Sequence, residues 1–441
     1  MIHSEEEEAR KTTALLVGKP GESLAELRGL ADTLGMETVR AVSLTRLEPS
    51  PAYGMGKGKA EELSALAEET GADVILFDWI VEPRKQRNWE KLAKRPCLDR
   101  QEVILRIFSQ RARTKEASLQ VQLARLEYSL PRLAHSYGDM ARQRGGNIGS
   151  RGAGETQLEL DLRGVRSRIA QIKRELGEVA RERETQHKRR RGLSVPQVAL
   201  AGYTNAGKSS LMNALTGADV FVEDKLFATL DPTTRKLRLK EGAGGTILLT
   251  DTVGFISNVP HGLVNAFKST LEEAEKADLV LLVLDAGDPN VESQYRTVVG
   301  VLEEIGADKN PRLVVLNKID TVSWNDPSLA RLESAFPGCA KTSARTGEGV
   351  AELSERIVRE VMGGARSVVI PTERAALVAE IRRAGILISE EWLADGIHVT
   401  MRGLELKRNG RLKNLLRPFA TQAFGADGPS EAERPPFRAD W

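Results

Sequence analysis

The sequence predicts an α/β protein with two parallel-sheet domains, an antiparallel helical hairpin between them and a small α+β domain at the end. Three observations lead to this fold class. Strand and helix signals alternate from residue 12 to about 112, which is typical of a parallel sheet covered by helices. Two apolar seams with heptad spacing follow and predict paired long helices. A glycine-rich loop between an apolar strand and a helix then opens the second parallel-sheet domain.

The first unit, residues 1–112, is predicted to be a small α/β domain. Its strand signals are Thr13–Val17, Thr38–Val42 and Asp73–Phe77, with helices between and after them. The run Gly54–Lys59 precedes one of these helices and could hold a phosphate at the helix N-terminus. A plain turn explains this run better, because it lacks the full Gly-x4-Gly-Lys-Ser form.

Residues 113–192 are predicted to form a long helical hairpin. Apolar residues recur at alternating steps of four and three in both halves, and Pro131 is expected to kink or end the first helix early. Such an arm could pair with a second copy or fold on itself, and we expect a monomer. The first seam is Leu119, Leu123, Leu126, Leu130 and Leu133, and the second is Leu158, Leu162, Val165, Ile169, Ile172, Leu176 and Val179.

The loop that joins the two predicted helices is rich in glycine and arginine. From Arg142 to Gln157 it contains five glycines and three arginines, and the following helix has eleven Lys or Arg against four Asp or Glu between Arg163 and Arg191. Glycine permits close approach to a phosphate backbone, and arginine donates bidentate hydrogen bonds to it. We therefore expect RNA contacts here, the alternative being a flexible connector beside a solvated basic face. The candidate RNA-contacting residues are Arg142, Arg144 and Arg151.

Residues 193–365 carry the motifs of a nucleotide-binding domain. A Gly-x4-Gly-Lys-Ser loop lies between a buried strand and a helix, so that backbone N–H groups can surround phosphates. Lys208 is expected to reach the β and γ phosphates, and Ser209 to bind Mg²⁺. Asn205 could offer a carbonyl oxygen to K⁺ beside the phosphates, or simply stabilise the loop. The predicted binding residues are Gly202, Tyr203, Thr204, Asn205, Ala206, Gly207, Lys208, Ser209 and Ser210.

Two later segments are predicted to sense the γ phosphate. In the first, Thr229 offers a hydroxyl to Mg²⁺ and the γ phosphate, with Thr233 and Thr234 as rivals on chemistry alone. In the second, Asp251 can hold Mg²⁺ through water, and the Gly254 N–H can contact the γ phosphate. The binding residues are Phe227, Ala228, Thr229, Leu230, Asp231, Asp251, Thr252, Val253 and Gly254, and the predicted catalytic residues are Lys208, Thr229, Asp251 and Gly254.

Phe255 follows the second segment, where many signalling GTPases carry a glutamine that positions water. A phenyl ring cannot orient water, so another group must supply that function.

The next motifs select the base. Asp320 ends the run Asn317, Lys318, Ile319 and Asp320, and its carboxylate suits the N1–H and amino donors of guanine. Ser343, Ala344 and Arg345 have the form of a loop that closes over the base. The motifs together predict a P-loop GTPase domain that binds GTP or GDP with Mg²⁺ and hydrolyses GTP to GDP and phosphate.

The rest of the chain bears on location more than on chemistry. Residues 366–424 are predicted to form a small α+β domain without catalytic residues, and residues 425–441 a disordered tail. The two cysteines, Cys97 and Cys339, suggest neither a disulfide framework nor a zinc site, which favours a reducing compartment. The acidic start lacks an apolar h-region, and no apolar run reaches the length of a membrane span. We therefore expect a cytoplasmic protein with no stable membrane insertion.

This ordered set of motifs resembles the HflX family of ribosome-associated GTPases. The resemblance runs from Gly54–Lys57 through Asp99-Arg100 and Gly154–Glu159 to the phosphate loop and Pro260-His261. It implies that Ser209 and Thr229 are the Mg²⁺ ligands. It further implies binding to the large (50S) ribosomal subunit and its rRNA, with the hairpin loop reaching toward the peptidyl transferase region. Splitting or rescue of stalled 70S ribosomes under stress, and ATP use by the N-terminal domain, are also implied.

The hairpin loop departs from the family pattern Gly-Gly-x-Gly-x-Arg-Gly-Pro-Gly. It has one extra residue, and Ala153 replaces the proline, which makes the loop more flexible. Three other functions stay open. A signalling GTPase would not need the hairpin, a ribosome assembly factor would bind precursor particles, and an ATP-driven RNA remodeller would use the N-terminal domain as its motor.

Overall fold

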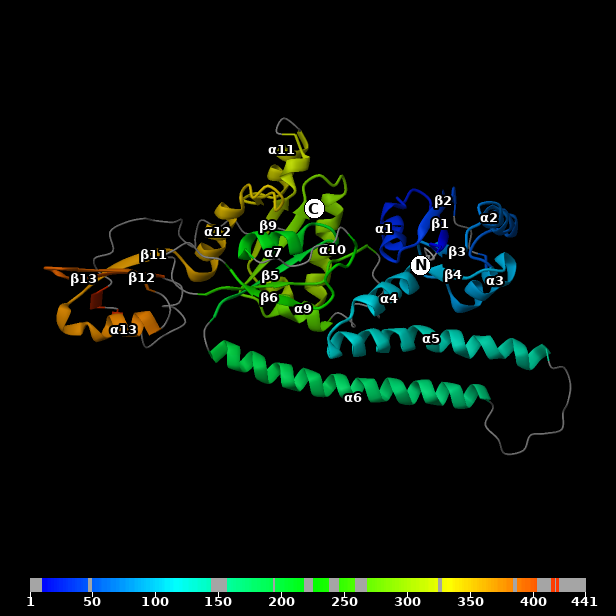
Figure 1. Cartoon of the computed structure of the whole chain (residues 1–441), viewed down its shortest axis with the longest axis horizontal. Helices are drawn as coiled ribbons and strands as arrows, with labels where there is room; N and C mark the ends of the chain where they lie inside the picture. The colour runs from blue at the N-terminus through cyan, green and yellow to red at the C-terminus, as the bar shows by residue number, and fades with distance from the viewer. Residues whose placement is uncertain are drawn as a thin grey trace, which may run out of the picture.

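The computed structural model describes residues 10–46, 50–143, 157–192, 195–217, 225–237, 246–257, 268–323, 327–383, 387–402, 414–416 and 418–419. A parallel α/β sheet, a helical hairpin, a mostly parallel α/β sheet and a small antiparallel sheet follow one another along the chain (Figure 1). The predicted fold class is therefore confirmed. Arg144, Arg151 and the tail 425–441 lie outside the described residues. Within the described ranges, every helix is too short or too polar to serve as a membrane span.

The N-terminal unit is a four-stranded parallel sheet in the order β2-β1-β3-β4. The inner strands β1 and β3 are apolar and buried, because helices cover both faces of the sheet. Strand β4 was not predicted, since three residues are too few to form a pattern. The elements are β1 (Thr13–Gly18), α1 (Ala25–Thr33), β2 (Glu37–Ser43), α2 (Lys57–Glu69), β3 (Val74–Phe77), α3 (Pro83–Ala93), β4 (Cys97–Asp99) and α4 (Arg100–Arg111).

The hairpin consists of α5 (Lys115–Gln143) and α6 (Gln157–Gly192), which lie antiparallel along the two α/β units (Figure 1). Leu119 and Ile172 of the predicted seams are buried. Helix α5 continues through Pro131, so the expectation that it ends there was wrong. Proline removes one backbone N–H, but the adjacent Arg132 donates to the Tyr128 carbonyl within α5. Arg132 also donates to Val81 O at 3.0 Å and to Asp99 Oδ2, which holds this turn to the N-terminal unit.

A buried polar cluster attaches α5 to the N-terminal unit. Arg132 Nη2 lies 2.9 Å from Asp99 Oδ2, and the Tyr128 hydroxyl donates to Asp99 Oδ1 at 3.0 Å. Asp99 is fully buried, and burial raises the pKa of its carboxyl group. Breaking one partner of such a buried pair is strongly unfavourable, so the arm is fixed to this unit.

The central unit is a six-stranded sheet in the order β10-β9-β8-β5-β7-β6, with β6 antiparallel to β7 and the other pairs parallel. Helices α7 and α12 pack in one core, and α9 and α10 in the other. Strand β6 was not predicted, because its four polar residues lack an apolar period. The strands are β5 (Gln197–Gly202), β6 (Thr233–Lys236), β7 (Leu248–Asp251), β8 (Leu279–Asp285), β9 (Arg312–Asn317) and β10 (Ala340–Lys341). The helices are α7 (Lys208–Thr216), α9 (Lys268–Glu275), α10 (Val291–Glu304), η1 (Ala307–Lys309), η2 (Ile319–Thr321), α11 (Pro327–Ala335) and α12 (Val350–Met362).

The C-terminal unit is a three-stranded antiparallel sheet in the order β11-β13-β12, with one face packed on a helix. This arrangement agrees with the predicted α+β class. Its elements are β11 (Ala365–Ile370), η3 (Thr372–Arg374), α13 (Ala376–Arg383), β12 (Leu387–Leu393) and β13 (Gly396–Arg402).

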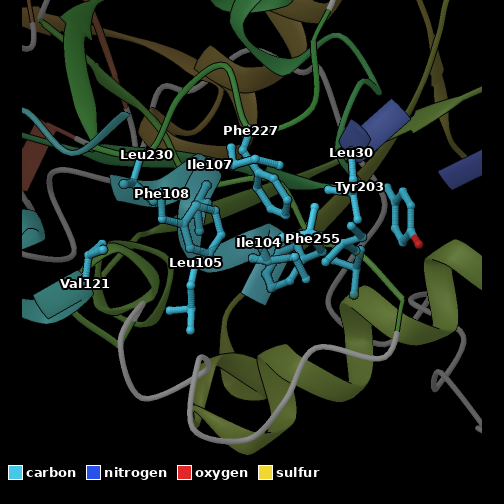
Figure 2. Packing of buried hydrophobic residues seen from close by; sticks show 14 of the residues in the cluster. Leu30, Ile104, Leu105, Ile107, Phe108, Val121, Tyr203, Phe227, Leu230 and Phe255 are labelled. Atoms are coloured by element: carbon cyan, nitrogen blue, oxygen red, sulfur yellow. The ribbon is translucent and has the colours of Figure 1, made fainter. Parts of the chain in front are cut away.

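The N-terminal and central units share one apolar core (Figure 2). The Phe108 ring of α4 meets the Phe227 ring edge to face, with 4.7 Å between centroids and 78° between planes. Leu230 and Phe255 lie in the same core. Because Phe227, Leu230 and Phe255 belong to the two segments after the phosphate loop, those segments are packed against the N-terminal unit.

Candidate functional site

The phosphate loop joins β5 to α7, and its shape depends on glycine. A Cβ on Gly202 would lie 2.2 Å from Val283 O, and one on Gly207 would lie 2.3 Å from Asn317 Nδ2. Gly207 also has φ of 86°, and Asn205 has φ of 61°. The exposed Asn205 thus adopts a left-handed conformation, which asparagine tolerates better than most residues. This conformation agrees with the predicted role of Asn205 in stabilising the loop.

Lys208 is buried at the start of α7. Its Nζ donates to Tyr203 O at 2.9 Å, and burial lowers its pKa to about 8, opposed by the charge of Asp251. A Cβ built on Gly254 would lie 2.9 Å from Lys208 Nζ and 2.8 Å from Thr204 Cγ2. The structure therefore places the predicted γ-phosphate glycine close to the predicted phosphate lysine.

Two hydroxyls and one carboxylate converge beside Lys208. Ser209 Oγ donates to Asp251 Oδ2 at 2.6 Å and lies 3.0 Å from Thr229 Oγ1. Asp251 is 1% exposed, burial raises its pKa, and its Oδ1 has no hydrogen-bond partner among the residues that the structure describes. A buried carboxylate oxygen without a partner, next to two hydroxyls, fits a hard cation such as Mg²⁺. Nowhere in the described ranges do three or more His, Cys, Asp or Glu side chains form a metal-binding group.

The position of Thr229 bears on the choice among three threonines. Thr229 Oγ1 lies beside Ser209, whereas Thr234 Oγ1 lies 3.0 Å from Thr250 Oγ1 on the neighbouring strand. Thr233 begins β6. The geometry therefore favours Thr229 as the hydroxyl that accompanies Ser209.

The side chains around Thr229 face the N-terminal unit and the arm. Phe227 and Leu230 are buried in the shared core, and the Leu226 N–H donates to Thr33 Oγ1 at 3.2 Å. The Asp231 carboxylate accepts hydrogen bonds from residues that precede α5. Phe227, Leu230 and Asp231 were predicted to bind nucleotide, but the contacts that the structure shows for their side chains are with other parts of the protein.

The residues predicted to recognise the base meet at the carboxyl ends of β9 and β10. Asn317 Nδ2 donates to Ala206 O at 2.9 Å, and its Oδ1 accepts from the Ala344 N–H at 3.1 Å. Asp320 Oδ1 accepts from Ser343 Oγ at 2.6 Å, while Arg345 Nε lies 3.7 Å from Asp320 Oδ2. Asn317 therefore ties the phosphate loop to the base loop, and Asp320 is held in place by Ser343.

Some residues at the site were missed by sequence reasoning. Asp285 ends β8 and lies 2.8 Å from Lys318 Nζ, which fixes the lysine of the base motif. Its position after an apolar strand next to β9 was the available signal. Glu26 and Arg100 of the N-terminal unit also reach this site through Tyr203 and Ser257. No local pattern marks Glu26, and Arg100 was noted only as part of the Asp99-Arg100 segment of the resemblance, without a role at this site.

The parallel sheet, the phosphate loop with its lysine, the serine–threonine–aspartate cluster and the aspartate of the base motif define a phosphate-loop GTPase. Three family models match the chain: "GTP-binding GTPase N-terminal" over 21–109, "GTP-binding GTPase Middle Region" over 111–190 and "50S ribosome-binding GTPase" over 197–318. The chain belongs to the HflX family of GTPases, which hydrolyse GTP.

Similarity to members of this family extends over most of the chain. The chain is 41% identical to the GTPase HflX of Escherichia coli K12 over 87% of its own length and 89% of that protein. It is 43% identical to the GTPase HflX of Akkermansia muciniphila over 86% of this chain and 89% of that protein. A solved structure of an SsGBP and GDP complex is 25% identical with a TM-score of 0.47, covering 80% of this chain and 98% of that chain.

Proposed function

We propose that this GTPase binds the large (50S) ribosomal subunit in the cytoplasm and that its bound nucleotide controls the affinity. On this proposal it splits or rescues stalled 70S ribosomes under stress. Support comes from the description of the model that matches residues 197–318 and from a long arm whose second helix is basic. The observation that carries the proposal is a direct connection between a nucleotide-sensing segment and that arm.

This connection is made by Asp231, two residues after Thr229. Asp231 Oδ2 accepts hydrogen bonds from the Arg113 and Thr114 N–H groups at 3.0 and 3.2 Å, and Oδ1 accepts from Thr114 Oγ1 at 2.5 Å. Thr114 in turn accepts from the Ala117 N–H at 3.2 Å, as an N-cap residue does. The negative charge of Asp231 at the N-terminus of α5 also interacts favourably with the positive end of the helix dipole. A change around Thr229 would therefore act on the first turn of α5.

The reaction chemistry assigns a role to each clustered side chain. Ser209 and Thr229 would hold Mg²⁺ directly and Asp251 through water, and the cation would neutralise charge on the phosphates. Lys208 would contact the β and γ phosphates, with the Gly254 N–H on the γ phosphate. K⁺ beside Asn205 is a further proposal for the same loop. Since Phe255 is buried in the shared core and cannot orient water, we propose that the ribosome completes the catalytic site.

RNA recognition is assigned to the hairpin loop. We propose that Arg142, Arg144 and Arg151 contact rRNA, since arginine forms bidentate hydrogen bonds with phosphate. The arm is fixed to the N-terminal unit through Arg132 and Asp99, so that α5 can carry the loop at a defined distance from the nucleotide.

Co-sedimentation tests the proposal. The full chain is spun with purified 50S, 30S and 70S particles in the presence of GDP or a non-hydrolysable GTP analogue. We expect binding to 50S that is at least about tenfold tighter with the GTP analogue, a difference of 1.4 kcal/mol. Binding that ignores the nucleotide, or no binding, would contradict it. Preference for precursor particles over mature 50S would instead indicate an assembly factor.

Removing the Asp231 connection should uncouple the arm from the nucleotide. In Thr114→Ala, Asp231 loses one of its donors and α5 loses its cap, at about 1 kcal/mol for the cap. We expect the 50S affinity ratio between GTP analogue and GDP to fall about fivefold, measured by co-sedimentation. Asp231→Ala should lower it further. Ser118→Ala, one turn along the same helix, is the matched control and should keep the ratio. An unchanged ratio in Thr114→Ala and Asp231→Ala would exclude this route.

A further inference from the structure

A polar cluster links the N-terminal unit to both the phosphate loop and the second sensing segment. We call it the interdomain clamp, and it consists of Glu26, Arg100, Tyr203 and Ser257. Glu26 Oε1 accepts from the Tyr203 hydroxyl at 2.6 Å and from the Ser257 N–H at 3.2 Å. The Ser257 hydroxyl donates to Glu26 Oε2, and Arg100 Nη2 donates to Ser257 O at 3.0 Å. One carboxylate therefore joins two segments of the GTPase.

Burial makes the clamp stiff. Arg100 is 3% exposed and pairs with Asp78 at one end and Glu26 at the other. Burial raises the pKa of the Tyr203 phenol, and the nearby Glu26 charge raises it further, so the hydroxyl stays a donor. Charge-assisted hydrogen bonds of this kind are stronger than neutral ones, and their loss leaves buried groups without partners.

The clamp holds the backbone of the second segment against the phosphate loop. The Phe255 N–H donates to Gly202 O at 3.1 Å, and the Thr204 N–H donates to Phe255 O at 2.7 Å. These bonds form an isolated parallel bridge between Tyr203 and Phe255. Figure 2 shows the Tyr203 side chain at the edge of the shared core, to which Phe255 also belongs. The Gly254 backbone consequently lies close to Lys208, since a Cβ built on Gly254 would come within 2.9 Å of Lys208 Nζ.

This arrangement bears on which nucleotide the site prefers. A γ phosphate that contacts both Lys208 Nζ and the Gly254 N–H must lie between them, and the clamp holds the Gly254 backbone close to the lysine. A γ phosphate bound there would displace Gly254 and Phe255 from the loop, whereas GDP would not. A conformation that competes with one ligand lowers the apparent affinity for that ligand alone.

We propose that Glu26 and Arg100 are positioning residues, which hold residues 254–257 on the phosphate loop and so bias the site toward GDP. The N-terminal unit would then set the nucleotide preference of the GTPase through two side chains. This inference rests on the GTPase activity and is independent of ribosome binding. Contacts that pull α1 or α4 away from Ser257 would raise the preference for GTP.

Equilibrium binding of GDP and a non-hydrolysable GTP analogue to the full chain tests the clamp. Glu26→Gln keeps the size of the side chain and removes the charge. We expect the ratio of Kd for the GTP analogue to Kd for GDP to fall about tenfold, from the strength of charge-assisted hydrogen bonds. Tyr203→Phe and Ser257→Ala each remove one hydroxyl and should lower the ratio about threefold. Glu26→Asp should restore part of the wild-type ratio. Glu22→Gln, also on the N-terminal unit, is the matched control and should leave the ratio unchanged.

The ratio separates positioning from structural support. A variant that unfolds at lower temperature yet keeps the wild-type ratio would overturn the proposal, as would a ratio that rises. Should Glu26→Gln fail to fold, Tyr203→Phe and Ser257→Ala decide, since each deletes a single oxygen; wild-type ratios in both would overturn it. If the wild-type chain did not bind 50S but the clamp variants lowered the Kd ratio as expected, only the proposed function would be contradicted.

Discussion

Asp320→Asn should lower the affinity for GTP by about 10⁴, the discrimination expected when a site built for a substrate hydrogen bond is mispaired. Both oxygens of an ionised Asp320 carboxylate can accept hydrogen bonds, and Ser343 already fixes Oδ1. An asparagine would present one acceptor and one donor, so its NH₂ group would face the donors of guanine. Equilibrium binding of GTP and GDP measures the loss.

The same substitution has a built-in control in the ligand. Xanthosine triphosphate carries a carbonyl oxygen where guanine carries an amino group, so the asparagine variant should bind it better than GTP. Asp288→Asn, a neighbouring carboxylate that accepts from Gln294, should leave GTP binding unchanged. If Asp320→Asn kept full GTP affinity, guanine recognition would lie elsewhere. Full ribosome activity in a variant that no longer binds GTP would favour an ATP motor in the N-terminal unit.

The nucleotide site could be predicted because its residues come in short contiguous runs. Each run follows an apolar strand, and parallel strands bring their carboxyl ends to one edge of a sheet. That is why Lys208, Ser209, Asp251 and Asp320 could be predicted as candidate site residues from the sequence. The choice of Thr229 over Thr233 and Thr234 needed the resemblance, and the structure supports it through the contact with Ser209.

The interdomain contacts could not be predicted, because their partners are far apart in the chain. Glu26 and Ser257 are separated by 231 positions, and Asp231 and Thr114 by 117. No local sequence pattern predicts that these residues meet. A single glutamate on a helix, such as Glu26, usually lies in solvent. Pro131 failed as a stop signal for a related reason, because Arg132 and Tyr128 stabilise the helix through contacts with the N-terminal unit. Tertiary packing overrides local propensity at such positions.

Removal of the hairpin loop should strongly weaken binding to the ribosome. Replacing Arg142 to Gln157 by a short Gly-Ser linker removes three arginines. Hydrogen bonds to charged groups contribute about 1.5–3 kcal/mol each, so we expect 50S affinity to fall at least about 10³-fold. GTP binding should persist, because the end of α5 at Gln143 lies beside the N-terminal unit, away from the GTPase sheet (Figure 1). Co-sedimentation and equilibrium nucleotide binding measure the two effects.

A triple variant in which Arg142, Arg144 and Arg151 become alanine distinguishes charge from loop length. If phosphate contacts dominate, this variant should lose nearly as much 50S affinity as the linker variant. The slope of log Kd against log salt concentration should also become shallower, by about 0.7–0.9 for each of the three arginines. Arg331→Ala removes an exposed arginine far from the arm and should change neither quantity. Equal 50S binding by the linker variant and the wild type would show that the arm does not recognise RNA through this loop. The basic face of α6 would then be the remaining candidate, and its residues Arg163 to Arg191 would be tested by the same salt dependence.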